Sequence, residues 1–240
     1  MIKITKSDQH YRNVTDWLDT SHHFSFANYF DPKKMNYGPL RVFNDDIVQP
    51  ATGFDLHPHS DMEIITYVIQ GQLEHKDNQG NHGIIKKGEI QTMTAGSGIM
   101  HSEYNPSQTE SLRLLQIWIF SDKKGLKPSW NQRKFTNDER RNILLPIVTG
   151  ISSNIKNTLR ISQDVKMYIS SLEKEKRLNY KLQENRKSYL FVIDGALKVN
   201  SQSLETRDSA MVENEEIDIS AQKPSEIILI DLPEKFVVNQ

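Results

Sequence analysis

Two pairs of side chains in this chain are suited to binding a metal ion. The first pair is His57 and His59, and the second is His101 and Glu103. Each pair is spaced i, i+2, which places both side chains on one face of a β-strand. Imidazole and carboxylate groups are ligands for first-row divalent metals. The four residues therefore predict a metal site of three histidines and one carboxylate, presented by two strands.

The other histidines are interpreted differently. The chain has 8 histidines in 240 residues, and His101 is the last of them, so a histidine-built site must lie in the first half. We expect His22 and His23 to belong to the packing or surface of the N-terminal segment. His75 and His82 flank a polar turn and are expected to be solvated.

Composition excludes several classes of function. The 30 basic and 31 acidic residues give a net charge of −1, which argues against a general nucleic-acid or membrane-surface binder. The absence of cysteine excludes disulfides, thiol catalysis and iron–sulfur ligation. No apolar run approaches the ~20 residues that span a bilayer, and the first residues lack the apolar segment of a secretory signal. We therefore expect a soluble, cytoplasmic protein.

The periodicity along the chain is mostly that of β-strands. The expected strands cover 64–69, 84–85 and 112–120, with a hairpin turn over 76–81. Short strands with frequent turns are typical of a sandwich, barrel or jelly roll. Short helices are expected only within 7–19 and 137–142.

A short internal repeat suggests a duplicated domain. Val-Ile-Gln-Gly-Gln-Leu at 68–73 resembles Val-Ile-Asp-Gly-Ala-Leu at 192–197, an offset of 124 residues (192 minus 68). The same offset carries His57 and His59 to Lys181 and Gln183, which are not typical metal ligands. The second copy is therefore predicted to lack a metal site.

The repeat and the composition suggest two domains. We predict a metal-binding N-terminal domain over 1–135 and a C-terminal domain without metal ligands over 136–240. Residues 121–150 are rich in charge and turn residues and are expected to form a surface linker between them.

Three segments together resemble the pirin family. They are Gly-Phe-Asp-Leu-His-Pro-His-Ser-Asp-Met-Glu at 53–63, Thr-Ala-Gly-Ser-Gly-Ile-Met-His-Ser-Glu at 94–103 and His-Phe-Ser-Phe-Ala-Asn-Tyr-Phe-Asp-Pro at 23–32. The first two are also close to the two cupin motifs. The resemblance implies an all-β bicupin, in which two double-stranded β-helix (jelly-roll) barrels follow each other and the N-terminal one binds one metal ion.

The same resemblance implies a site and an activity. The family's four ligands fall on His57, His59, His101 and Glu103. The expected metal is Fe(II), with copper, manganese, cobalt, nickel or zinc as alternatives. The implied activity is that of a quercetin 2,3-dioxygenase, which opens a flavonol ring with O2 and releases carbon monoxide; Glu103 would serve both as a ligand and as the base.

Two alternatives to the enzyme remain open. Some pirins are described as transcriptional cofactors or enzyme modulators, so the chain could be a metal- or redox-sensing regulatory protein with a protein partner, or a metal-stabilised fold without catalysis. A solvent-reachable cavity at the metal favours the enzyme, and a filled barrel mouth beside a charged face favours the regulator. Glu63, a ligand position in ordinary cupins, is assigned a structural role, and Gln116 either faces the cavity or is structural.

Overall fold

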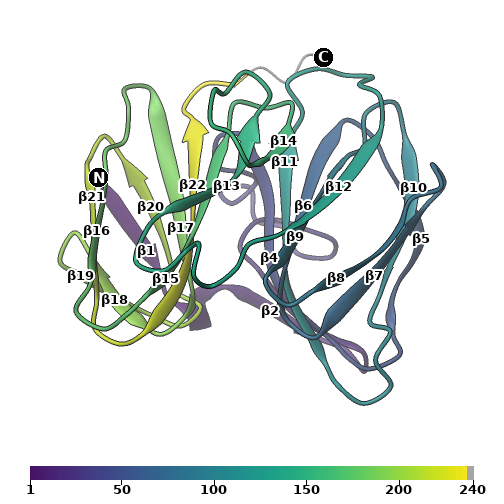
Figure 1. Ribbon diagram of the computed structural model, residues 1–240, viewed down its shortest axis with the longest axis horizontal. Helices are drawn as coiled ribbons and strands as arrows, with labels where there is room; N and C mark the ends of the chain where they lie inside the picture. The colour runs from purple at the N-terminus through teal and green to yellow at the C-terminus, as the bar shows by residue number, and fades with distance from the viewer. Residues whose placement is uncertain (237–240) are drawn as a thin grey trace. The chain divides into compact units, whose positions relative to one another are not determined.

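The computed structural model describes residues 1–236, and they form two β-barrels (Figure 1). Among these residues the single helical element is a 3₁₀ turn, η1 (Ser7–Gln9). The N-terminal barrel is the unit formed by Tyr11–Lys134 with Ile161–Gln163. The C-terminal barrel is the unit formed by Met1–His10, Phe135–Arg160 and Asp164–Phe236.

The N-terminal barrel consists of two sheets. The seven-stranded sheet has the order β12-β9-β6-β11-β4-β3-β2, and the four-stranded sheet has the order β5-β10-β7-β8. Their strands are β2 (Tyr11–Val14), β3 (Leu18–His22), β4 (Leu40–Val48), β5 (Gly53–His59), β6 (Met62–Gln70), β7 (Gln72–Asp77), β8 (His82–Lys86), β9 (Glu89–Thr94), β10 (Ile99–Tyr104), β11 (Leu112–Phe120) and β12 (Ser129–Lys134).

The C-terminal barrel repeats this plan. Its seven-stranded sheet has the order β1-β20-β17-β22-β15-β13-β14, and its four-stranded sheet the order β16-β21-β18-β19. Their strands are β1 (Ile2–Thr5), β13 (Leu145–Gly150), β14 (Leu159–Ile161), β15 (Lys166–Leu172), β16 (Arg177–Tyr180), β17 (Arg186–Asp194), β18 (Ala196–Val199), β19 (Gln202–Glu205), β20 (Ser209–Glu213), β21 (Ile217–Ala221) and β22 (Ser225–Pro233).

The predicted all-β fold of two jelly-roll barrels is confirmed, whereas both predicted helices are wrong. The strand expected at 112–120 is β11, the one expected at 64–69 lies within β6, and β7 and β8 form the expected hairpin. Residues 7–19 hold only η1 and the start of the β2–β3 hairpin, and residues 137–142 form turns. The helical patterns were short, and isolated short helices are weak compared with strand pairing in a sheet.

The first strand of the chain lies in the second barrel. β1 pairs along its whole length with β20, with Ile2 opposite Val212 and Thr5 opposite Ser209. The predicted N-terminal domain over 1–135 includes this strand, because a strand-like sequence pattern does not indicate which other strand it pairs with. The predicted linker over 121–150 contains two strands, β12 and β13, one in each barrel.

The repeated strand–glycine–strand segment occupies equivalent places in the two barrels. Gly71 joins β6 to β7 at φ +77°, and Gly195 joins β17 to β18 at φ +102°. A Cβ atom would lie 2.9 Å from the Ser111 carbonyl oxygen at Gly71 and 2.4 Å from the Pro224 carbonyl oxygen at Gly195. Both positions therefore require glycine for backbone conformation and for close approach.

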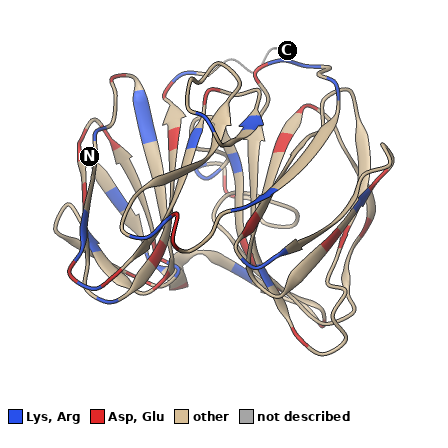
Figure 2. Cartoon of the chain, viewed as in Figure 1, with Lys and Arg blue, Asp and Glu red and all other residues tan. Residues whose placement is uncertain are grey.

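Charges of both signs are interspersed along the strands of each barrel (Figure 2), consistent with the net charge of −1. The helical content of residues 1–236 includes nothing long and apolar enough to cross a membrane.

Candidate metal centre

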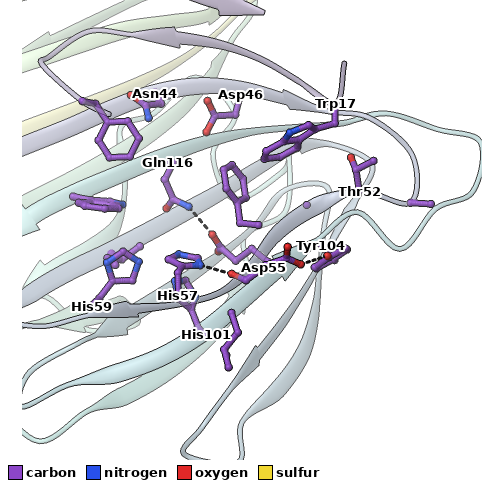
Figure 3. Close-up of a pocket in the computed structure, with 18 residues that line it drawn as sticks. Trp17, Asn44, Asp46, Thr52, Asp55, His57, His59, His101, Tyr104 and Gln116 are labelled. Atoms are coloured by element: carbon purple, nitrogen blue, oxygen red, sulfur yellow. Dashed lines mark hydrogen bonds between the residues drawn. The ribbon is translucent and has the colours of Figure 1, made fainter. Parts of the chain in front are cut away.

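The three predicted histidine ligands converge inside the N-terminal barrel (Figure 3). β5 carries His57 and His59, and β10 carries His101 directly opposite His57. The ring centroids are 4.4 Å apart for His57 and His101, 4.8 Å for His57 and His59, and 5.0 Å for His59 and His101. One nitrogen from each ring lies within 4.8 Å of the others, so one divalent ion can contact all three.

The hydrogen bonds of the rings leave nitrogen lone pairs for a metal. The Nδ1 of His57 lies 2.6 Å from the carbonyl oxygen of Asp55, which can only accept, so Nδ1 carries the proton and Nε2 is free. The Nε2 atom of His101 is buried and has no hydrogen-bond partner. A buried imidazole nitrogen without a partner requires an explanation, and a bound cation supplies one. The residues therefore fit a metal ion.

Burial also keeps two of the rings neutral, as metal ligation requires. Loss of hydration lowers the pKa of His59 to about 4 and that of His101 to about 3, and the neighbouring histidines act in the same direction. The ligand nitrogens are therefore available without deprotonation at neutral pH.

Glu103, also on β10, is 2% exposed and is held by three side chains of the seven-stranded sheet. Gln91 Nε2 donates to its Oε1 at 2.5 Å, Gln116 Nε2 donates to its Oε2 at 2.7 Å, and Thr66 Oγ1 lies 3.3 Å from Oε1. The carboxylate oxygen of Glu103 forms a second group of potential metal-ligand atoms with His101 and His75, separate from the group of His57, His59 and His101. Gln116, whose role the sequence left open, both lines the cavity and positions Glu103.

These three side chains belong to a larger set that we call the polar row. Residues directly opposite in neighbouring strands place their side chains on the same face of a sheet. The pairs His22–Asn44, Asn44–Gln116, Gln116–Thr66 and Thr66–Gln91 run in this way across β3, β4, β11, β6 and β9. All five side chains are buried. A polar layer thus crosses the interior of the barrel beneath the histidines.

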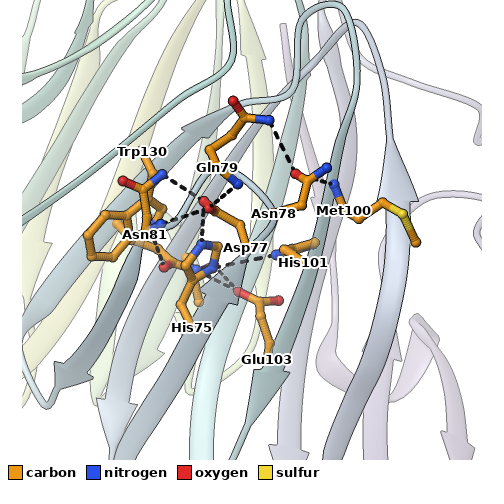
Figure 4. Close-up of polar contacts among 11 residues, drawn as sticks. His75, Asp77, Asn78, Gln79, Asn81, Met100, His101, Glu103 and Trp130 are labelled. Atoms are coloured by element: carbon orange, nitrogen blue, oxygen red, sulfur yellow. Dashed lines mark hydrogen bonds and ion pairs between the residues drawn. The ribbon is translucent and has the colours of Figure 1, made fainter.

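His75 is a neighbour of the histidine cluster that the sequence interpretation missed (Figure 4). It was expected to be solvated, but its side chain is fully buried, stacked on Trp130 with ring centroids 5.1 Å apart. Its Nε2 lies 3.2 Å from Asp77 Oδ2, and its Nδ1 lies 3.5 Å from the Nδ1 of His101. The i, i+2 spacing of His75 and Asp77 on β7 was the available clue.

The positions of the protons in the hydrogen-bonded series Asp77, His75 and His101 follow from the carboxylate of Asp77, which can only accept. The carboxylate of Asp77 accepts from the Nε2–H of His75, which leaves the Nδ1 of His75 as an acceptor. The Nδ1–H of His101 then faces that acceptor, and its Nε2 lone pair is free. Asp77 is itself fixed by Asn81, whose side-chain amide donates at 2.8 Å. His75 and Asp77 therefore select the tautomer of His101 that can bind a metal through Nε2.

A cavity of about 710 Å³ opens onto the histidine cluster. This volume is in the range of small-molecule binding sites. Its wall contains His57, His59 and His101, and much of the remainder is aromatic: Trp17, Phe26, Phe54, Tyr104 and Trp118. The cavity is therefore suited to a flat, largely apolar molecule that reaches the histidines.

The remaining candidates lie outside the cluster. Glu63 is fully buried and accepts hydrogen bonds from Thr94 Oγ1 at 2.7 Å and from the backbone N–H of Ser162 at 2.9 Å, and burial raises its pKa. The next residue, Ile64, lines the cavity, so Glu63 faces the opposite side of β6. His23 packs on the ring of Phe43.

Two family models match the chain. The model described as Pirin matches residues 4–119, and the model described as Quercetinase C-terminal cupin domain matches residues 151–232. The first match covers β2 to β10 and nearly all of β11 in the N-terminal barrel, and the second covers β14 to β21 and nearly all of β22 in the C-terminal barrel.

Individual relatives extend over almost the entire chain. A protein of Escherichia coli K12 named quercetin 2,3-dioxygenase is 39% identical over 97% of this chain and 99% of its own length. A pirin-like protein of Caulobacter vibrioides is 43% identical over 90% and 92%. The crystal structure of the bacterial pirin YhhW from Escherichia coli in complex with nickel(II) has a TM-score of 0.91 at 38% identity, covering 98% of this chain and 100% of that one. On sequence and on fold alike, the chain belongs to the pirin family.

Proposed function

We propose that this protein is a metal-dependent dioxygenase that cleaves a flavonol-like aromatic substrate. The observation that carries the proposal is the aromatic-lined cavity with three convergent imidazoles in its wall. The name quercetin 2,3-dioxygenase, borne by a relative that is 39% identical, supports the same reaction. In this reaction the flavonol ring opens, both atoms of O2 enter the ring-opened product, and one ring carbon leaves as carbon monoxide.

We propose that His57, His59, His101 and Glu103 bind one divalent transition metal, with iron as the expected ion. The nickel(II) complex of the related bacterial pirin supports a site of this type, and copper, manganese, cobalt or zinc are chemically compatible with the same donors. When bound, the metal supplies Lewis acidity toward a substrate oxygen and a redox centre for O2.

The side chains have separate tasks in this proposal. Glu103 takes the proton of the substrate's enol hydroxyl on a carboxylate oxygen. Gln91 and Gln116 hold that carboxylate in place through their amide N–H groups. The ring of Trp118 packs at 82° to that of His59, with centroids 4.8 Å apart. It reduces the space that water can occupy beside this candidate metal ligand.

The regulatory alternative is less well supported. It would be favoured by a filled barrel mouth, whereas this barrel has an open cavity that reaches the candidate ligands. If wild-type protein loaded in turn with iron, copper, manganese, cobalt or nickel consumes no O2 with any flavonol, the regulatory function should replace the enzymatic one.

The carboxylate is tested with a matched pair of variants. Glu103→Gln removes the base, and we expect turnover of quercetin to fall about 10²–10⁴-fold while much of the metal is retained. Because the new amide would face two amide donors, the double variant Glu103→Gln, Gln116→Glu serves as the control: it restores a carboxylate–amide pair but moves the charge to the neighbouring strand. Turnover should stay low in both variants. Wild-type turnover in metal-loaded Glu103→Gln, measured as O2 uptake, would exclude Glu103 as the base.

A further inference from the structure

One wall of the cavity carries two buried oxygen atoms without a hydrogen-bond partner. They are the Oδ1 atoms of Asn44 and Asp46, and each side chain is 3% exposed. Both residues line the cavity. They are spaced i, i+2 on β4 and so point to the same face. In Figure 3 they lie across the cavity from His57, His59 and His101.

The hydrogen bonds of the polar row do not extend to these two atoms. Gln116, Thr66 and Gln91 all direct hydrogen bonds toward Glu103, whereas Asn44, the next member of the row, has no partner for its oxygen. Buried acceptors in folded proteins are almost always paired, and an unpaired one is destabilising. A pair of them on a cavity wall is explained if a ligand supplies the missing donors.

The charge state of Asp46 fits such a role. Burial raises its pKa to about 7, contact with the Thr20 hydroxyl opposes this rise, and the nearby carboxylates Asp45 and Glu103 add to it. Near neutral pH the group is therefore available both as an acceptor and as a donor. A hydroxyl group can pair with either form, because it is itself both donor and acceptor.

We propose that Asn44 and Asp46 form a hydroxyl-recognition subsite that selects polyhydroxylated aromatic substrates. This inference rests on the proposed function, since one end of the substrate must face the histidine cluster. A second hydroxyl at the far end would then meet β4, while the aromatic side chains of the wall contact the ring faces. A substrate without that hydroxyl would leave both oxygens unpaired and would bind less tightly.

The first test needs only the wild-type protein. The metal-loaded protein is titrated, in the absence of O2, with quercetin and with 3-hydroxyflavone, which keeps the metal-facing hydroxyl and carbonyl but lacks the remote hydroxyls. Titration calorimetry gives both dissociation constants. We expect quercetin to bind at least about tenfold more tightly, because a buried hydrogen-bonding site discriminates strongly against a ligand that lacks its partner. Equal affinities would overturn the subsite.

The second test assigns the discrimination to residues. Asn44→Leu and Asp46→Leu replace the unpaired groups with an apolar side chain of similar size. Each should weaken quercetin binding and leave 3-hydroxyflavone unchanged or tighter, bringing the ratio toward one. Ser188→Ala in β17 is the control, because the Ser188 hydroxyl oxygen is also buried without a hydrogen-bond partner but does not line this cavity. That variant should keep the wild-type ratio, and an unchanged ratio in Asp46→Leu would exclude Asp46 from recognition.

Thermal stability separates recognition from a structural role. Because it removes an unpaired buried oxygen, Asn44→Leu should melt at or above the wild-type temperature without ligand, whereas Asp46→Leu also removes the contact with the Thr20 hydroxyl and should melt slightly below it. Marked loss of stability would show that the two residues support the fold instead. If no flavonol binds the wild-type protein, the proposed function fails and this inference fails with it; if flavonols bind and are cleaved with no preference, only the subsite fails.

Discussion

The two barrels share the order of their central strands, yet within residues 1–236 the histidine cluster and its aromatic-lined cavity lie in the N-terminal one. Strands β6, β11, β4 and β9 of the N-terminal barrel correspond in sheet order to β17, β22, β15 and β20 of the C-terminal barrel. The four-stranded sheets, β5-β10-β7-β8 and β16-β21-β18-β19, correspond in the same way. The difference between the barrels must therefore come from side chains.

The polar row shows where the side chains diverge. Thr66 corresponds to Leu190 by the offset of the repeat. In the C-terminal barrel Leu190 lies opposite Ala210 on one side and Leu229 on the other, and Leu229 lies opposite Tyr168. An apolar row thus replaces the polar row at the same register.

The apolar clusters of the two barrels differ in the same way as these rows. In the C-terminal barrel Leu190, Leu229 and Ala210 belong to one apolar cluster. In the N-terminal barrel, one cluster contains Val68 and Leu114 and another contains Ile64 and Met93. The polar row lies between these two clusters along the length of the strands: on β6, Thr66 stands between Ile64 and Val68. A single layer of polar side chains therefore separates two apolar clusters, whereas the corresponding cluster of the C-terminal barrel is continuous. The barrel with the divided core contains the cavity that can hold a ligand.

The strands that carry the metal ligands differ in the same way. The equivalents of β5 and β10 are β16 and β21, whose buried or partly buried positions include Leu178, Tyr180, Ile217 and Ile219. Lys181 and Gln183, to which the offset carried the ligand positions, lie beyond the end of β16. The C-terminal barrel thus presents no imidazole where the N-terminal barrel presents three.

Removing a candidate ligand should have the largest effect and should be confined to one barrel. We expect His101→Ala to weaken metal binding by more than the roughly 10–100-fold that loss of an outer-shell partner causes. The melting temperature in the presence of metal should fall as well, because a metal that binds only the folded state stabilises it. Competition with a chromophoric chelator measures the affinity. Ile219→Ala in β21 is the control, and an equal loss of metal affinity there would contradict the assignment.

Exchanging the rows tests whether they explain the two interiors. Leu229→Gln buries an amide among apolar neighbours and should destabilise the protein by about 3–5 kcal/mol, the sum of lost apolar burial and an unpaired polar group. The reciprocal change, Gln116→Leu, removes one donor from Glu103 and should cost about 1–3 kcal/mol. Urea unfolding measures both. A neutral Leu229→Gln would mean that the C-terminal barrel already has room for polar groups.

His75 should affect the metal without contacting it. His75→Phe keeps a ring stacked on Trp130 but removes the acceptor for His101, and we expect metal affinity to fall about 10–100-fold. His82→Phe, at an exposed position of the neighbouring strand, is the control and should leave affinity unchanged. Equal affinities for His75→Phe and wild type would mean that the tautomer of His101 is set in another way.

The smallest effect concerns pH and the metal-free protein. Burial holds the pKa of His59 at about 4 and that of His101 at about 3, below the ordinary value of 6.5. Between these values the unfolded chain binds more protons than the folded protein. The free energy of unfolding should therefore be highest above pH ~6.5 and should decrease as the pH falls toward ~4; the partly exposed His59 should contribute less than the buried His101, because solvent screens it.

Urea titrations at a series of pH values measure this slope. His59→Gln should flatten it, whereas His82→Gln, at a solvent-exposed position, should not. A slope that is equal in wild type and His59→Gln would show that the buried histidines do not control acid stability.

Features that depend on local spacing could be predicted from the amino-acid sequence alone. Runs of β-branched residues predicted β6 and β11, the repeated strand–glycine–strand segment predicted two similar domains, and the i, i+2 pairs placed His57 with His59 and His101 with Glu103 on shared strand faces. These inferences succeed locally because the pleat of a strand and the conformational freedom of glycine are properties of adjacent residues.

The pairing of distant strands, in contrast, could be learned only from the folded protein. The partner of β1, the burial of His75, and the meeting of Gln91, Gln116 and Thr66 around Glu103 all depend on register between strands far apart in the chain. A polar residue in a strand pattern looks the same whether it faces solvent or a buried carboxylate. Its role is decided when neighbouring strands bring it a partner or, as at Asn44 and Asp46, leave a place for one.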